Sequence, residues 1–224
     1  MKRSLIVESK PLVEVIEELT TSGSWTVPAG CRKVDVFLVG GGAGGAYNAG
    51  GGGYTNTVMD VAVTPGEIIK YIIGEGGKYG GMNGDAGPGG ETSFATFSAD
   101  GGSIVNNNLV KGGDGGSGGA GYTHATGGLD GGDGNHGNSG DAGSSCPGGK
   151  GQGTSTRCPF TGKLYSTGGS TGRNIVNPTG NWGSGPNTQY RHGSNNSGEG
   201  GSGSGWYGGN GGSGIIILRY KKYE

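Results

Sequence analysis

The hydrophobic positions of the chain fall into short runs in which apolar and polar residues alternate. In residues 33–39, valine and leucine occupy every second position, which is typical of a β-strand that buries one face. Three further short runs rich in β-branched residues predict strands at residues 57–63, 67–73 and 215–220. The pattern therefore predicts an all-β protein with antiparallel strands.

Two other stretches carry weaker patterns. Phe94 and Phe97 face Ile104 and Val105 across the glycines of residues 100–102, which predicts a strand pair around that turn. Residues 12–19 fit both a helical stripe, through Leu12, Val15, Ile16 and Leu19, and a strand that includes Val13 and runs into two threonines. Periodicity alone leaves this second stretch open.

The composition is unusual for an all-β protein, because 60 of the 224 residues are glycine. Most of them lie in residues 40–53, 74–90 and 112–214, between the predicted strands. Proline numbers only 8, far below the content of a collagen triple helix. With a net charge of −1, nothing favours a nucleic-acid partner or an anionic membrane surface.

Glycine recurs at every third position in several separate blocks. One such series is Gly205, Gly208, Gly211 and Gly214, and others occupy residues 81–90, 112–121 and 131–143. A period of three is that of the polyproline II helix, whose backbone groups must find hydrogen-bond partners in neighbouring segments. Gly/Ser-rich stretches can also be flexible linkers, but a linker has no reason to keep this phase.

Three short motifs resemble catalytic or metal-binding signatures without their structural context. Residues 40–45 form GxGxxG after a predicted strand, yet no helical period follows to hold a pyrophosphate. Residues 168–172 form GxSxG without a strand-turn-helix around them. Residues 131–136 approach the GGxGxD calcium repeat, but His136 stands where the acid should be and Asn138 where an aliphatic residue should. We expect no enzyme activity, no catalytic residue, no cofactor and no metal site.

The cysteines and the N-terminus bear on where the chain folds. Cys31, Cys146 and Cys158 form no CxxC pair, and a Cys146–Cys158 bridge is left open beside the reduced state, which we favour. Residues 1–8 lack a signal-peptide core, and no run is long enough to cross a membrane. We expect folding in a cytoplasm, without membrane insertion.

Several of these segments resemble, in order and spacing, the glycine-rich domain of phage tail fibre and adhesin proteins. The matching residues are 25–30, 34–42, 63–66, 90–94 and 211–217, with 151–157 and 161–165 resembling versions from gut bacteria and their phages. The resemblance covers about residues 17 to 220 and implies an antiparallel β-sandwich or jelly roll with inserted polyglycine II helices. It also favours a strand for residues 13–20. It carries no shared catalytic residues.

We expect one glycine-rich β-sandwich domain at residues 17–224, with glycine-rich excursions at 40–53, 74–90 and 112–214. Residues 1–16 precede the resemblance and are expected to attach the domain to other virion subunits. The function expected is that of a bacteriophage virion protein, a tail fibre tip adhesin for host attachment. The alternative is a structural virion component, such as a head fibre, decoration or fibre-assembly protein, that binds only other virion subunits.

A receptor-binding adhesin would contact a glycan or a protein on the bacterial surface. Aromatic side chains offer a large contact area at low entropic cost, so those in the glycine-rich stretches are the candidates, together with a neighbouring arginine and two histidines. They are Tyr122, His124, Trp182, Tyr190, Arg191, His192, Trp206 and Tyr207. Each could instead pack over the ends of the glycine helices, whereas Trp25 and Tyr71 are expected in the core. Homo-oligomerisation is left open.

Overall fold

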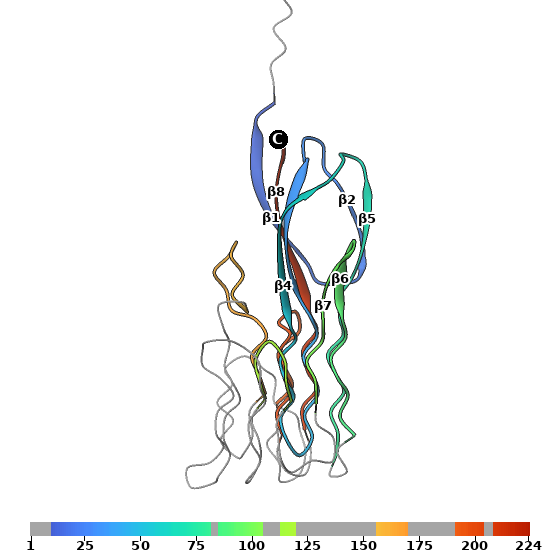
Figure 1. Cartoon of the computed structure of the whole chain (residues 1–224), viewed down its shortest axis with the longest axis vertical. Coiled ribbons are helices and arrows are strands. Elements are labelled where there is room, and N and C mark those ends of the chain that lie inside the picture. The colour runs from blue at the N-terminus through green and yellow to red at the C-terminus, as the bar shows by residue number, and fades with distance from the viewer. Residues whose placement is uncertain (1–9, 82–84, 105–112, 120–155, 170–190, 204–207) are drawn as a thin grey trace, which may run out of the picture.

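The computed structural model describes residues 10–81, 85–104, 113–119, 156–169, 191–203 and 208–224 (Figure 1). These residues contain eight β-strands and no α-helix. The strands are β1 (Leu12–Leu19), β2 (Gly23–Thr26), β3 (Lys33–Val39), β4 (Thr55–Ala62), β5 (Ile68–Ile72), β6 (Thr92–Phe94), β7 (Phe97–Ala99) and β8 (Ile215–Tyr223).

The strands form two antiparallel sheets of four. The order in the first sheet is β1-β8-β3-β4, and in the second it is β2-β5-β6-β7. Every pairing is antiparallel, with β8 between β1 and β3. The prediction of an all-β chain with antiparallel sheets is therefore confirmed for the residues described.

The stretch that periodicity left open is a strand. In β1, Leu12 lies opposite Tyr223 and Leu19 opposite Ile216, without a break in register. Val15 and Leu19 of this strand pack on the hydrophobic core, while Ile16 is exposed. Burial of alternate side chains is the strand period, and it outweighs the helical stripe in the same letters.

Residues of both sheets contribute to one hydrophobic core. Trp25 of β2 is 5 % exposed and contacts the rings of Phe94 and Tyr220, so its expected core position is confirmed. The other face of the first sheet carries a second cluster, in which Phe37 contacts the ring of Tyr165. The segment 156–167 thus covers part of that face.

The hairpin predicted around residues 100–102 is wrong. β6 and β7 instead pair through a tight turn at Ala95 and Thr96, where Ala95 has a φ of 52°. The N–H of Gly102 donates to the carbonyl oxygen of Gly41, so these glycines bond to other segments. The glycines expected in this turn make backbone hydrogen bonds to segments that are distant in the sequence. Rules for local turns do not predict such bonds.

Beyond the sheets, the glycine-rich segments run side by side along the long axis of the molecule (Figure 1). We call these described segments together the glycine-rich block; they are residues 40–54, 74–81, 85–90, 100–104, 113–119, 166–169, 191–203 and 208–214. Residues 40–45, the GxGxxG motif, lie in this block and lead into no helix.

Within the block, every third residue of a segment bonds to the same neighbour. The N–H groups of Gly41 and Gly44 donate to Gly90 and Gly87, and those of residues 40, 43 and 46 donate to residues 54, 51 and 48. The N–H groups of residues 42 and 45 donate to residues 212 and 209. Three edges of one segment thus face three different neighbours, which satisfies the backbone without side chains.

At many positions the segments lie too close together for a side chain. A Cβ added at Gly42 would overlap the carbonyl oxygen of Glu199, and one at Gly45 would overlap that of Ser202. At Gly81, in contrast, a Cβ would meet nothing within 4 Å. Glycine is therefore required at these close approaches, although some side chains, such as those of Ala43 and Ser117, are buried within the block.

Candidate functional site

Most of the site residues expected from the sequence lie outside the described residues. This applies to Tyr122, His124, Trp182, Tyr190, Trp206 and Tyr207. Arg191 and His192 are described. Arg191 is 7 % exposed, and its backbone exchanges hydrogen bonds with Ser202, whereas the neighbouring His192 is half-buried and lines a groove.

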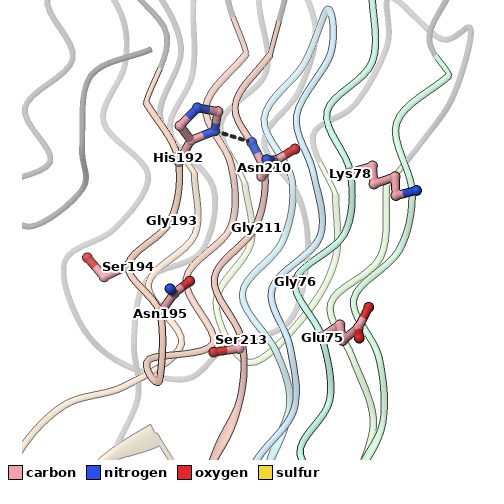
Figure 2. Close-up of a pocket in the computed structure, with 10 residues that line it drawn as sticks. All are labelled: Glu75, Gly76, Lys78, His192, Gly193, Ser194, Asn195, Asn210, Gly211 and Ser213. Carbon is pink, nitrogen blue, oxygen red and sulfur yellow. Dashed lines mark hydrogen bonds between the residues drawn. The ribbon is translucent and has the colours of Figure 1, made fainter.

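The groove lies on one flank of the glycine-rich block and has a volume of about 670 Å³ (Figure 2). Three segments build it, at residues 75–78, 192–195 and 210–213, and the first of them is far from the other two in the sequence. The N–H of Gly211 donates to Gly77 and that of Gly193 to Asn210, so the segment 210–213 is bonded to both others. In Figure 2, His192, Ser194 and Asn195 lie on one side of it, and Glu75 and Lys78 on the other.

Backbone hydrogen bonds fix two of the groove's side chains. His192 Nδ1 accepts the N–H of Asn210 at 2.8 Å, so this nitrogen carries no proton, and burial lowers the pKa of the imidazole. Asn210 Oδ1 accepts the N–H of Tyr79 at 2.8 Å. Because only the oxygen can accept, the bond sets the amide orientation and leaves Nδ2 as a donor.

Two opposite charges lie on the 75–78 side of the groove. Glu75 and Lys78 are exposed and three residues apart, the interval that repeats the same edge in this block. Among the residues described, the carboxylate and the ammonium form no ion pair with each other or with another group. The groove therefore carries both signs of charge, and each charge can act on a ligand.

The opposite side of the groove is formed by a turn that hydrogen bonds fix in place. The carboxylate of Glu199, which is 3 % exposed, accepts the N–H of Ser194 at 2.7 Å. Ser197 Oγ donates to the carbonyl oxygen of Ser194 at 2.6 Å and accepts the N–H of Glu199 at 3.1 Å. Ser213 Oγ likewise accepts the N–H of Asn196. The shape of this side is therefore preset before any ligand arrives.

Sequence reasoning found only His192 among the groove's side chains. It missed Glu75, Lys78, Ser194, Asn195, Asn210 and Ser213, because it weighted aromatic residues. A usable signal was present, since a residue other than glycine inside a glycine-rich stretch must sit where a Cβ has room. Such interruptions mark positions with room for a side chain, and the exposed ones among them, such as Glu75 and Lys78, lie on the surface of the block.

Other candidate chemistry is limited in the described part of the chain. Cys31 and Cys158 are buried free thiols, and burial raises the pKa of Cys31. The described residues contain no group of three or more His, Cys, Asp or Glu that could hold a metal ion. They also include no helix with the length and apolar character needed to span a bilayer.

Comparison with known proteins places the chain by its sequence. No curated protein matches it. The glycine-rich domain family matches residues 18–221. This range includes the last two residues of β1, all of β2 to β7, most of β8 and the entire groove. The chain therefore belongs to the glycine-rich domain family.

Proposed function

We propose that the chain is a phage virion protein, an adhesin at the tail fibre tip that binds a glycan or protein on the bacterial host. The observation that supports this most is the groove, a preset set of hydrogen-bonding side chains mounted on a block of closely packed glycine-rich segments. A rigid support lowers the entropic cost of binding. The resemblance of the sequence to tail fibre and adhesin domains points the same way.

The architecture proposed for this adhesin is a jelly-roll sandwich with a polyglycine II bundle. The shared core of the two sheets supports the sandwich. The bonding of every third residue to one neighbour supports the bundle, because three residues per turn is the period of this helix. Such a bundle would carry surface side chains far from the sheets.

Binding of the labelled protein to a panel of gut bacterial strains tests the proposal. Saturable binding to some strains is expected. A Trp182→Ala and Trp206→Ala double variant, shown to be folded by near-ultraviolet circular dichroism, tells whether these tryptophans contribute. Absence of binding to every strain would contradict the adhesin role.

A structural role in the virion is the second candidate, and the edge strand β1 favours it. Leu12 and Ile16 are 51 % and 45 % exposed, and among the described strands β1 pairs only with β8. An exposed strand edge can pair with a strand of another subunit. The double variant Leu12→Lys and Ile16→Lys changes exposed side chains of β1 and keeps Val15 and Leu19, which pack on the core, so a structural subunit should then fold but fail to join the virion. Incorporation of this variant at the normal level would contradict this role.

A further inference from the structure

We infer that the groove between residues 75–78, 192–195 and 210–213 is a binding site for uncharged carbohydrate. This inference rests on the proposed surface-binding function and deepens it by naming the site and the class of ligand. It follows from the hydrogen-bonding groups that line the groove, from its formal charges and the scarcity of apolar side chains, and from the hydrogen bonds that fix the lining residues.

The lining side chains offer both donors and acceptors. Glu75 supplies a carboxylate that only accepts, Lys78 an ammonium that only donates, and Asn195 an amide that does both. Asn210 adds Nδ2, whose orientation follows from the bond that Tyr79 gives to its oxygen. A sugar hydroxyl donates one hydrogen bond and accepts others, so a saccharide can use every one of these groups.

Charge argues against an ionic ligand. The carboxylate of Glu75 and the ammonium of Lys78 are the only formal charges among the lining residues when His192 is neutral. A phosphate or carboxylate ligand would meet one attractive and one repulsive group on the same side of the groove. A nucleic acid needs several basic groups, and this groove offers one.

The lining also argues against a protein loop or an apolar peptide. The ten lining residues include no aliphatic residue, and the imidazole of His192 is their one aromatic ring. Protein partners usually anchor a buried aromatic or aliphatic side chain in an apolar pocket. A ligand whose surface is mostly hydroxyl groups fits this lining better.

The length and stiffness of the groove suit a short stretch of an extended chain. Each of its three segments has four residues, which span roughly 9 Å from first to last at the polyproline II rise. His192, Asn210 and Ser194 are tied to backbone or buried groups, as described above. Preset groups lose little conformational entropy when a weakly binding sugar docks.

An array of immobilised bacterial oligosaccharides with uncharged, carboxylated and phosphorylated members tests the inference. The variants Glu75→Ala and Asn195→Ala remove exposed side chains of the groove. Glu91→Ala is the matched control, because Glu91 is equally exposed and lies outside the groove. Circular dichroism confirms that all three variants are folded.

We expect the wild type to bind uncharged members, with little change between roughly 50 mM and 500 mM salt. Each groove variant should weaken binding about tenfold, and the control should bind like the wild type. Binding to no member, binding only to charged members, or equal binding by the groove variants would overturn the inference.

A cell-binding assay with the same proteins separates this inference from the proposed function. If the wild type binds cells and the groove variants bind them equally well, the adhesin role stands and the groove is not its carbohydrate site. If uncharged sugars bind in the groove but no bacterial strain is bound, the groove inference stands and the adhesin role does not.

Discussion

At the residue scale, the space around each Cα decides which positions can hold a side chain. Where two segments of the glycine-rich block face each other, as at Gly42 and Gly45, a Cβ would overlap a backbone carbonyl. Side chains such as Glu75 and Lys78 are confined to outward edges, where they become the surface available to a ligand. The close approach of the segments thus limits which positions of the block can contribute a side chain to the groove.

Two glycine substitutions test this account of the packing. Gly42→Ala should lower the free energy of unfolding by about 3 kcal/mol or more, because its Cβ meets backbone that cannot move alone. Gly81→Ala has open space and should raise it by about 0.5 kcal/mol by restricting the unfolded chain. Urea unfolding followed by tryptophan fluorescence measures both, and equal effects of the two substitutions would contradict the account.

The hydrogen bond at His192 predicts a loss of stability in mild acid. Burial lowers the pKa of this imidazole in the folded protein, so the unfolded chain binds the proton more readily. The contribution of neutral His192 is fully present above the unfolded pKa of about 6.5 and is lost as the pH falls below it. The free energy of unfolding should therefore be lower at about pH 5 than at about pH 7.5.

His192→Asn separates this effect from that of other titrating groups. Asparagine can place an acceptor near the position of Nδ1 and does not titrate, so the variant should show a weaker dependence on pH over this range. An unchanged dependence would mean that His192 is not its source. Asp35 also titrates, but it is a carboxyl group whose pKa is set by other contacts. Burial alone would raise this pKa, and hydrogen bonds from the Asp60 N–H and from Arg219 outweigh burial, so the pKa of Asp35 is lowered.

At the scale of elements, the strands with strong local patterns were predictable and those defined by distant partners were not. Residues 33–39 are predicted as a strand and form β3 with the same bounds. β2 has only four residues, three of them exposed, so its pattern is too short to identify. β1 needed its pairing with β8 to settle the choice between helix and strand, because that choice depends on which face is buried.

One side chain connects elements of both sheets and provides a prediction at this scale. Glu17 Oε2 of β1 accepts hydrogen bonds from Trp25 Nε1 of β2 at 3.2 Å and from Tyr220 Oη of β8 at 2.7 Å. Burial, and then this bond to Glu17, raise the pKa of Tyr220 above its ordinary value. Glu17→Ala leaves both donors without this acceptor and should cost about 1 to 3 kcal/mol of unfolding free energy.

Glu14→Ala serves as the control for this substitution. Glu14 lies on the same strand but is exposed, so its removal should change the unfolding free energy by less than about 0.5 kcal/mol. Thermal or urea unfolding of the two variants gives the comparison. Equal stability of Glu17→Ala and Glu14→Ala would show that the contact between the sheets contributes nothing measurable.

At the scale of the whole molecule, the groove could not be predicted, because one of its segments lies more than a hundred residues before the other two. Glu75 and Asn210 become neighbours only after the block has formed. The three-residue glycine phase did predict that segments would satisfy their backbones between neighbours, and Gly41 and Gly44 do so. The three-residue phase does not predict which segments become neighbours, because the glycine-rich segments share the same sequence pattern.

The central claim is that the glycine-rich segments form an ordered support for a binding surface, and amide hydrogen exchange tests it most directly. The N–H groups of residues 41, 42, 44 and 45 donate to other segments at 2.8 to 2.9 Å, so they should exchange as slowly as those of β3 and β8. Exchange of these glycines at the rate of an unstructured peptide, while β3 and β8 stay protected, would contradict the claim.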